Sequence, residues 1–273
     1  MGALRWAVCN EIFGGISFAA MAAAIRRAGY AGVEIAPFTL GEDPGSLPLE
    51  ERREIRRILE MEGLGFAGLH WLLAAPAGLH LTAPDGPLRR RSWDYLRRLI
   101  DLCADLGGGV LVLGSPKQRS ATGGATPEQA RASLVEGLAE AAAYCAARGC
   151  CLLLEALSPD QTDVITALDE AAGIVRRIDH PGLATMFDTH NAAAEKEPHA
   201  ALLEKHFDLI RHVHLNEMDG GAPGTGSYDF RPVLEVLERR DFAGWVSLEI
   251  FGKSEDPEGM IARSLRYLRG DGG

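Results

Sequence analysis

Short apolar segments of strand length alternate with longer amphipathic segments of helical length along the whole chain, and this alternation constrains the fold more than any other feature. The pattern predicts a parallel sheet, because each helix returns the chain to the starting edge of the sheet. We expect strands at 5–10, 32–36, 65–71, 109–114, 150–156, 182–188, 209–215 and 244–250. We expect helices at 17–29, 48–63, 87–107, 126–149, 166–179, 192–207, 229–241 and 256–270, with Pro198 interrupting the sixth.

Eight strand–helix units within 273 residues favour a closed (β/α)8 TIM barrel of the α/β class over a doubly wound open sheet. No linker or change of composition divides the chain, so we expect residues 1–273 to form a single domain. In such a barrel the functional groups lie at the carboxyl ends of the strands and in the loops that follow them. We therefore look for candidate catalytic and ligand-binding residues at the carboxyl ends of the predicted strands.

Charge and hydropathy argue against several classes of partner. The formal net charge is −10 with acidic and basic residues interspersed, so no basic tract fits a phosphate backbone and we expect no nucleic-acid partner. The apolar segments fall far short of the roughly 20 residues that a membrane helix needs, and the first residues lack a signal-peptide pattern. The five cysteines include no CxxC pair. We interpret them as small buried residues of a protein in a reducing, cytoplasmic compartment.

Four consecutive strands in the second half end on residues of the kinds that bind metal ions. The fifth ends at Glu155, the sixth at Asp188, the seventh at His214 and the eighth at Glu249. Taken singly, a salt bridge explains Glu155, a helix cap explains Asp188 and an arginine partner explains Glu249. Four such residues at neighbouring strand ends favour a shared cation, because buried carboxylates are costly without one. Three carboxylates and one imidazole suit a divalent ion such as Mn²⁺, Co²⁺ or Mg²⁺.

The seventh strand carries two histidines, His212 and His214, which face the same side because they are two residues apart. His214 is nearer the carboxyl end and is the one that we expect on the metal. We expect His212 to lie in a buried layer below it or to donate a hydrogen bond to a ligand.

Several segments resemble the xylose-isomerase-like sugar isomerase/epimerase superfamily, in the style of the tagatose and allulose 3-epimerases. They are LLLEALSPDQTDVITALDEA (152–171), MFDTHN (186–191), RHVHLNE (211–217), GTGSYDF (224–230) and GWVSLEIF (244–251). The resemblance implies one divalent metal ion, Mn²⁺ first and Co²⁺ next, held by Glu155, Asp188, His214 and Glu249. It also implies that Glu155 and Glu249 are the catalytic acid/base pair, and that the chain associates into homodimers or homotetramers.

This set of ligands is suited to proton transfer next to a carbonyl group. A cation bound to a carbonyl oxygen and a neighbouring hydroxyl acidifies the carbon-bound proton and stabilises the enediolate. Two carboxylates on opposite faces of the substrate then remove a proton from one side and return it on the other, which is epimerisation. Return to the neighbouring carbon gives isomerisation, and loss of a β-hydroxyl gives dehydration. The ligands alone therefore do not select the reaction.

The residues around the ligands depart from the 3-epimerase pattern. In the family's Asp-x-x-His motif, His190 comes one residue early and Asn191 stands in the place of the histidine. Gln161 stands where the family has a glutamate. Glu217 keeps the family's His-x-x-Glu spacing, but Gly220 stands where an arginine is expected. We expect His190, Asn191, Gln161 and Glu217 to contact a sugar-like substrate that differs from a free ketohexose.

Other side chains at the predicted mouth of the barrel offer further substrate contacts. Lys117 and Arg119, after the fourth strand, would clamp an anionic group such as a phosphate or carboxylate, or would belong to an ordinary solvated loop. His70 and Trp71, at the end of the third, would form a wall for a sugar ring, although packing explains Trp71 as well. Glu34, near the end of the second, would bind a hydroxyl or pair with an arginine.

We therefore expect an enzyme, a metal-dependent isomerase or epimerase of a sugar, polyol ketone or related hydroxy-ketone. The alternative is a metal-dependent lyase on the same scaffold, either an inosose- or dehydroshikimate-type dehydratase or an enzyme that cleaves a sugar conjugate. An abasic-site endonuclease would need more zinc ligands and a basic face. A barrel without catalytic activity is the remaining hypothesis.

Overall fold

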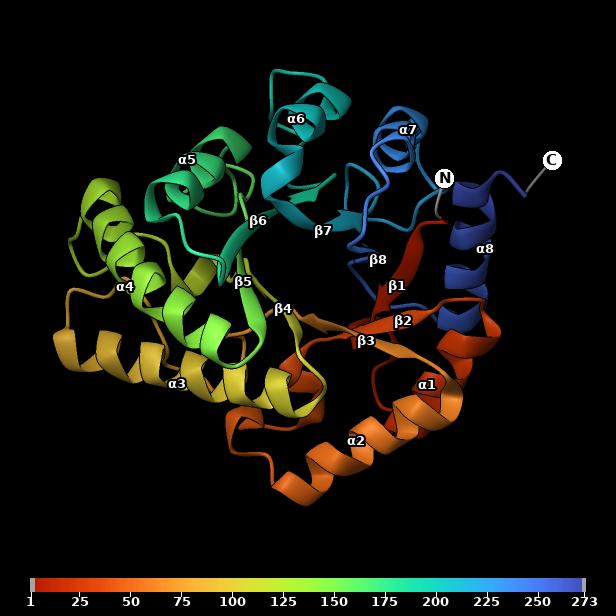
Figure 1. Ribbon diagram of the computed structural model, residues 1–273, viewed down its shortest axis with the longest axis horizontal. Helices are drawn as coiled ribbons and strands as arrows, with labels where there is room; N and C mark the ends of the chain where they lie inside the picture. The colour runs from red at the N-terminus through yellow and green to blue at the C-terminus, as the bar shows by residue number, and fades with distance from the viewer. Residues whose placement is uncertain (1–2, 272–273) are drawn as a thin grey trace.

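Eight parallel strands close into a barrel, and the prediction of a (β/α)8 TIM barrel is confirmed. The computed structural model describes residues 3–271. Each strand pairs with the next along the chain, and β8 pairs with β1 to close the barrel (Figure 1). The strands are β1 (Arg5–Cys9), β2 (Gly32–Ile35), β3 (Gly65–Leu69), β4 (Gly109–Leu113), β5 (Cys150–Leu154), β6 (Leu183–Asp188), β7 (Ile210–Leu215) and β8 (Trp245–Leu248).

A helix follows each strand and lies on the outside of the barrel (Figure 1). The helices are α1 (Phe18–Arg27), α2 (Leu49–Glu62), α3 (Gly86–Asp105), α4 (Pro127–Ala147), α5 (Leu168–Ile178), α6 (His199–His206), α7 (Arg231–Arg239) and α8 (Pro257–Arg269). Polar caps define several of their starts. Ser17, before α1, accepts the Ala20 N–H, and Thr126, before α4, forms reciprocal hydrogen bonds with Gln129 in the first turn of that helix.

Two boundary errors bear on the site, at the start of the sixth helix and at the end of the third strand, and the fifth and eighth strands also end two residues early, at Leu154 and Leu248. The helix predicted over 192–207 begins only at His199, because Pro198 occupies the position before its first turn and cannot continue a helix from the preceding residues. The strand predicted over 65–71 ends at Leu69. His70 and Trp71 therefore lie in the loop at the mouth of the barrel and not within the sheet.

The side chains inside the barrel include an apolar cluster and, towards the carboxyl ends of several strands, a group of polar residues. Val112, Leu153, Ala184 and Met186, from β4, β5 and β6, form a compact apolar cluster inside it. Their neighbours in sequence point outward, into the larger apolar layer between strands and helices. Towards the carboxyl ends of β1, β2, β7 and β8 the buried residues are polar, and they include Glu34, His212, His214 and Ser247. Polar residues inside a barrel must be satisfied by one another or by a ligand.

The register of the sheet brings the predicted ligands to one level. Asp188 pairs with His214, and His214 pairs with Ser247, two residues before Glu249. Leu154, directly before Glu155, pairs with Thr185 of β6. The carboxyl ends of β5 to β8 therefore meet around one point.

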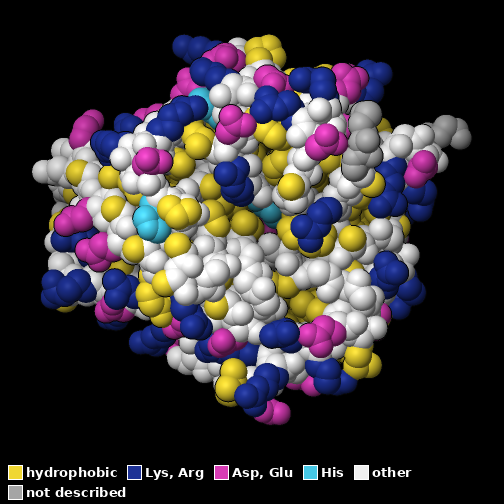
Figure 2. Space-filling view, viewed as in Figure 1, with side chains coloured by type: hydrophobic (Ala, Val, Ile, Leu, Met, Phe, Trp, Pro, Cys, Tyr) yellow, Lys and Arg dark blue, Asp and Glu magenta, His cyan; other side chains and the backbone are white. Residues whose placement is uncertain are grey.

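The visible face of the molecule carries charges of both signs, and the cysteines are unpaired. Figure 2 shows Lys and Arg side chains interspersed with Asp and Glu around the visible face, without a continuous basic patch. Within residues 3–271, no helix is both long enough and apolar enough to cross a membrane. Every cysteine is a free thiol, and four of the five are buried.

Candidate metal-binding and catalytic site

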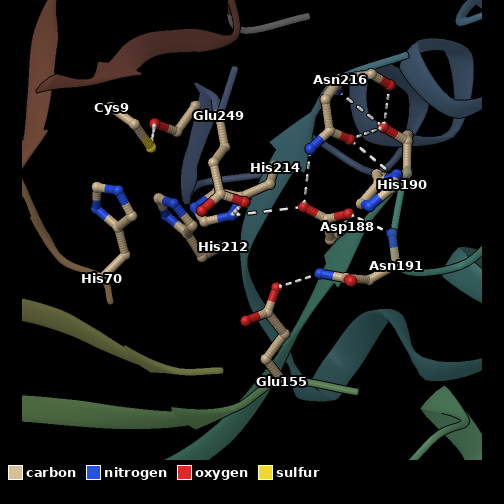
Figure 3. Close-up of polar contacts among 12 residues, drawn as sticks. Cys9, His70, Glu155, Asp188, His190, Asn191, His212, His214, Asn216 and Glu249 are labelled. Carbon is tan, nitrogen blue, oxygen red and sulfur yellow. Dashed lines mark hydrogen bonds and ion pairs between the residues drawn. The ribbon is translucent and has the colours of Figure 1, made fainter. Parts of the chain in front are cut away.

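Four side chains from the ends of β5 to β8 converge at the carboxyl end of the barrel. Glu155 directly follows β5, Asp188 ends β6, His214 is the last residue but one of β7, and Glu249 directly follows β8. One ligand atom from each lies within 4.8 Å of the others, and all four residues are buried. Figure 3 shows Glu155, Asp188 and Glu249 directed towards a common space beside His214. The structure thus brings the four predicted metal ligands together.

The imidazole of His214 is oriented for a cation. Its Nε2 lies 3.1 Å from Glu34 Oε1, whereas its Nδ1 lies 3.2 Å from Glu249 Oε2 and 3.6 Å from Asp188 Oδ2. Among the described residues Nδ1 is buried without a hydrogen-bond partner. Burial alone would lower the pKa of His214, but Glu34 and Glu249 hold this pKa well above its ordinary value. A proton therefore stays on Nδ1 until a cation displaces it.

The two glutamates of the cluster have different environments. Burial, and then repulsion from Glu249 and Asp188, raises the pKa of Glu155 to about 8. Burial also acts on Glu249, but His214 and the Trp71 indole N–H, 2.8 Å from Glu249 Oε1, hold the pKa of Glu249 below its ordinary value. At neutral pH one carboxyl is protonated and the other ionised. Such a difference between neighbouring carboxyls suits an acid and a base.

Two side-chain amides fix the Glu155 carboxylate. Asn191 Nδ2 donates to Glu155 Oε1 at 2.9 Å (Figure 3). Gln161 Nε2 donates to Asn191 Oδ1 at 2.7 Å. The backbone N–H of Asn191 donates to Asp188 Oδ1 at 2.6 Å. Gln161 is held in turn by Ser158, whose Oγ accepts from Nε2 at 2.9 Å. Asn191 thus holds two carboxylates of the cluster at once.

A buried polar layer centred on Glu34 lies beneath the cluster. His212 Nε2 lies 2.7 Å from Glu34 Oε2, and His70 Nδ1 lies 3.7 Å from Glu34 Oε1. The other ring nitrogen of His70 lies 2.9 Å from Glu11 Oε2. Burial would raise the pKa of Glu34, but His212 and His214 hold this pKa well below its ordinary range. Glu34 therefore orients histidines, as an outer partner of a metal ligand does, and forms no ion pair with an arginine within residues 3–271.

A small cavity of about 60 Å³ adjoins the cluster. Its walls include His70, Trp71, Gly114, Ser115, Glu155, Gln161, Asn191, Glu249 and Phe251. The Trp71 side chain is 43% exposed, and its φ of 51° places it in the left-handed region that a tryptophan rarely adopts. Strain of this kind is typical of functional sites, where the surroundings hold a side chain in place. The residues predicted to form an aromatic wall therefore lie at the cavity.

The two basic residues predicted to clamp an anion do not line this cavity. Lys117 is exposed on the short 3-10 helix Pro116–Gln118. Arg119 is fully buried, and its Nη1 donates to the Leu113 carbonyl at 3.1 Å. Burial lowers the pKa of Arg119 to about 10, so the guanidinium stays charged at neutral pH. Its charge acts on Glu155 from behind the cavity wall.

Glu217 and His190 surround the site without lining the cavity. Glu217 accepts the backbone N–H groups of Gly224 and Tyr228 at 2.9 and 3.1 Å, and thereby orders the loop after β7. His190 Nδ1 donates to the Met218 carbonyl at 2.7 Å. Its ring lies 5.3 Å from that of Phe251, which does line the cavity.

Three further residues belong to the site and were not singled out from the sequence. Asn216 Nδ2 donates to Asp188 Oδ2 at 3.3 Å, and Asn216 Oδ1 accepts the His190 backbone N–H at 2.8 Å. Glu11 contacts His70, and Phe251 lines the cavity. Asn216 and Phe251 each lie two residues beyond a predicted ligand, and Glu11 lies two residues beyond β1. A search that continued past each strand end would have found all three.

Comparison with known proteins finds relatives that are named as sugar epimerases. The chain is 25% identical over 171 residues to fructoselysine 3-epimerase of Shigella flexneri, and the match covers 61% of each chain. It is 26% identical to ketose 3-epimerase of Arthrobacter globiformis over 72% of this chain and 69% of the relative. The chain thus matches about three fifths of the length of the first relative and somewhat more of the second.

Solved structures share the whole fold. The crystal structure of 3-keto-D-glucoside 4-epimerase from Escherichia coli superposes with a TM-score of 0.85 at 21% identity, covering 98% of this chain and 100% of the other. At this level of identity the likeness shows the fold alone. Residues 22–270, however, match the sequence family described as the xylose isomerase-like TIM barrel. The chain belongs to the xylose isomerase-like TIM barrel family.

Proposed function

We propose that this protein is a divalent-metal-dependent epimerase that acts next to the carbonyl group of a keto-sugar or a closely related hydroxy-ketone. The observation that carries the proposal is the buried cluster of Glu155, Asp188, His214 and Glu249, with ligand atoms within 4.8 Å of one another. Three carboxyl groups this close are unfavourable without a cation, and the raised pKa of Glu155 expresses that cost.

The donor set fits a divalent ion. Carboxylate oxygens and one imidazole nitrogen suit Mn²⁺, Co²⁺ or Mg²⁺, and we propose Mn²⁺ as the first to test. The buried Nδ1 of His214, without a hydrogen-bond partner in residues 3–271, supports this assignment. When bound, such an ion would polarise the substrate carbonyl and lower the pKa of the carbon-bound proton beside it.

The protein's own groups then move the proton. Glu155 and Glu249 follow β5 and β8, which are separated by β6 and β7 in the barrel, so the two carboxyl groups reach the site from different directions and can act on opposite faces of a bound substrate. Glu249, whose pKa is held below its ordinary value, is suited to accept a proton from the substrate. Glu155, which has lost its own proton when it binds the ion, would exchange a proton with the other face of the substrate. Asn191 holds Glu155 in place, and Trp71 holds Glu249.

The names of the relatives support a keto-sugar as the substrate. A fructoselysine 3-epimerase, a ketose 3-epimerase and a 3-keto-D-glucoside 4-epimerase all act beside a carbonyl group on a sugar skeleton. The replacement of the family's motif histidine by Asn191 gives this chain an amide partner for Glu155 and argues against a simple copy of the ketohexose enzymes.

Solvent isotope labelling tests the proposal. The Mn²⁺-loaded protein is incubated in D₂O with a panel of ketohexoses and 3-keto-glucosides, and the products are examined by NMR and mass spectrometry. We expect one deuterium at an inverted stereocentre beside the carbonyl, with loss of this activity in Glu155→Gln and Glu249→Gln. A product that has lost water and absorbs as an enone would support the dehydratase instead. Full activity after removal of divalent metal would refute the mechanism.

A further inference from the structure

A second hollow, of about 470 Å³, lies beside the reaction cavity, between α1 and α2 and under the loops that follow β1 and β2. Its wall is largely apolar and includes Phe13, Phe18, Met21, Ile55 and Ile58. Two of its other lining residues, Ile16 and Phe38, are exposed by 51% and 37%. Exposed apolar side chains gathered around one hollow are a common sign of a binding surface. We call this hollow the α1–α2 groove.

The groove has carboxylates in its wall, of which Glu54 is paired with Arg57 and Glu11 with His70, whereas Glu51 has no such partner among residues 3–271. Glu11, Glu51 and Glu54 line it, and no lysine or arginine does so among residues 3–271. The Glu11 Oε1 atom is buried and has no hydrogen-bond partner in that part of the chain. Glu51 is exposed at the first turn of α2. An apolar wall with carboxylates complements a ligand that is apolar over most of its length and carries a positive charge.

The groove and the reaction cavity share a wall. Glu11, on the groove side, lies 2.9 Å from His70, which lines the cavity. The Phe38 ring lies 6.1 Å from the Trp71 ring in an edge-to-face arrangement, and Trp71 donates to Glu249. A molecule that reacts at Glu249 and continues past Trp71 therefore enters the groove.

The sizes of the two spaces complement each other. The reaction cavity of about 60 Å³ is far below the roughly 300–1,000 Å³ of ordinary small-molecule sites, whereas the groove of about 470 Å³ lies within that range. The cavity thus accommodates only the reacting end of a substrate, and the groove offers room for the remainder.

We propose that the α1–α2 groove binds a substituent of the substrate, an alkyl or aryl group that bears an amine, attached to the keto-sugar that reacts at the metal site. The inference rests on the proposed function, because it places the reacting carbonyl at Glu155 and Glu249. It makes the substrate a sugar conjugate, and the groove determines which conjugates bind well.

Binding measurements test the groove separately from catalysis. The Mn²⁺-loaded protein is titrated by calorimetry with 3-keto-D-glucose, its n-hexyl β-glycoside and its 6-aminohexyl β-glycoside. We expect the hexyl glycoside to bind at least about tenfold more tightly than the free sugar, because its chain is removed from water. The amine should add roughly three- to fivefold through the groove carboxylates.

Two charge reversals in the same helical turn form a matched pair. Glu51→Lys should abolish the preference for the amine while leaving the affinity for the free sugar unchanged. Glu50→Lys is the control, because Glu50 is also exposed in the first turn of α2 but does not line the groove. The control should keep the preference.

Each outcome decides between the inference and its alternatives. Equal affinities for all three sugars, or an amine preference that survives Glu51→Lys, would overturn the groove assignment. If light scattering shows that Ile16→Asp dissociates an oligomer while the three affinities stay equal, the groove is a contact between copies of the chain. Deuterium exchange is measured on the same sugars. Binding without exchange would count against the epimerase, and exchange without the preference would count against the groove alone.

Discussion

The side chain of Glu155 is buried beside two other carboxyl groups, and these surroundings raise its pKa to about 8. A carboxyl whose pKa is higher in the folded than in the unfolded state destabilises the fold progressively as the pH rises from its ordinary pKa of 4.5 to 8. A carboxyl group placed for metal binding therefore lowers the free energy of unfolding of the metal-free protein.

In the metal-free protein at pH 7, Glu155→Gln should raise the free energy of unfolding by up to about 3 kcal/mol, because the amide carries no charge to bury. The gain should disappear near pH 4.5. Urea unfolding in excess chelator at the two pH values measures it. Glu136→Gln, at an exposed position of α4, should change stability by less than about 0.5 kcal/mol. A stability loss in Glu155→Gln at pH 7 would contradict the assigned environment.

Asn191 is the second residue with a defined role, because it holds Glu155 and Asp188 together. Asn191→Ala should lower kcat by roughly 10- to 100-fold, the usual effect of removing an outer partner of a metal ligand. Gln161→Ala, one hydrogen bond further away, should have a smaller effect. Steady-state kinetics with metal titration separates a loss of metal affinity from a loss of orientation. An unchanged kcat and metal affinity would remove Asn191 from the site.

The positions of site residues were predictable only where the end of a strand determines the direction of the side chain. Glu155, Asp188, His214 and Glu249 follow from the alternation of a strand and its carboxyl end. Arg119 was predicted at the mouth and is instead buried behind the cavity wall, because the loop after β4 turns inward. A loop residue has no period that fixes its direction, so the sequence could not distinguish a clamp from a buried charge.

At the scale of elements, the eight strands and eight helices were predictable because each has a clear hydrophobic period and several begin at a polar cap. The errors fell where backbone chemistry overrode the period, as at Pro198. The end of β3 is a further example. Its Gly68 has a φ of 156°, and the register between β2 and β3 shifts at this level. Such a shift is a long-range property that the pattern of one strand does not contain.

Gly68→Ala should destabilise the protein by about 2–3 kcal/mol, because an added Cβ would lie 2.4 Å from the Val110 carbonyl oxygen of the neighbouring strand. Gly63→Ala is the control. Gly63 also has a positive φ, but nothing lies within 4 Å of an added Cβ there. That change should cost only about 1 kcal/mol, the strain of the left-handed conformation. Thermal unfolding of both variants gives the comparison, and equal losses would contradict it.

At the scale of the whole molecule, metal binding is coupled to proton release and to stability. Before a cation binds, Glu155 and His214 both retain protons at neutral pH, since the pKa of each is raised. Both must be lost for the two groups to act as ligands. The affinity for a divalent ion should therefore increase as the pH rises.

We expect the Mn²⁺ dissociation constant to fall at least about tenfold per pH unit between pH 6 and 8. Calorimetry in buffers of different ionisation enthalpy counts the protons released. Glu155→Gln, if it still binds the ion weakly, should release one proton fewer. At a metal concentration of 100 times the dissociation constant, the bound ion should stabilise the fold by about 2.7 kcal/mol. Affinity that does not depend on pH would show that these groups are already deprotonated.

Trp71 gives the molecule an optical reporter of its own site. The indole N–H donates to Glu249, and the ring is partly open to solvent beside the α1–α2 groove. The fluorescence emission of Trp71 should change when a cation withdraws electron density from Glu249. It should also change when a ligand covers the indole ring. The other three tryptophans provide a nearly constant background, because Trp6 and Trp245 are buried near the amino ends of β1 and β8 and the half-buried Trp93 of α3 is held by its hydrogen bond to the Leu81 carbonyl. The occupancy of both the cluster and the groove should therefore be readable from fluorescence, without labels and without turnover.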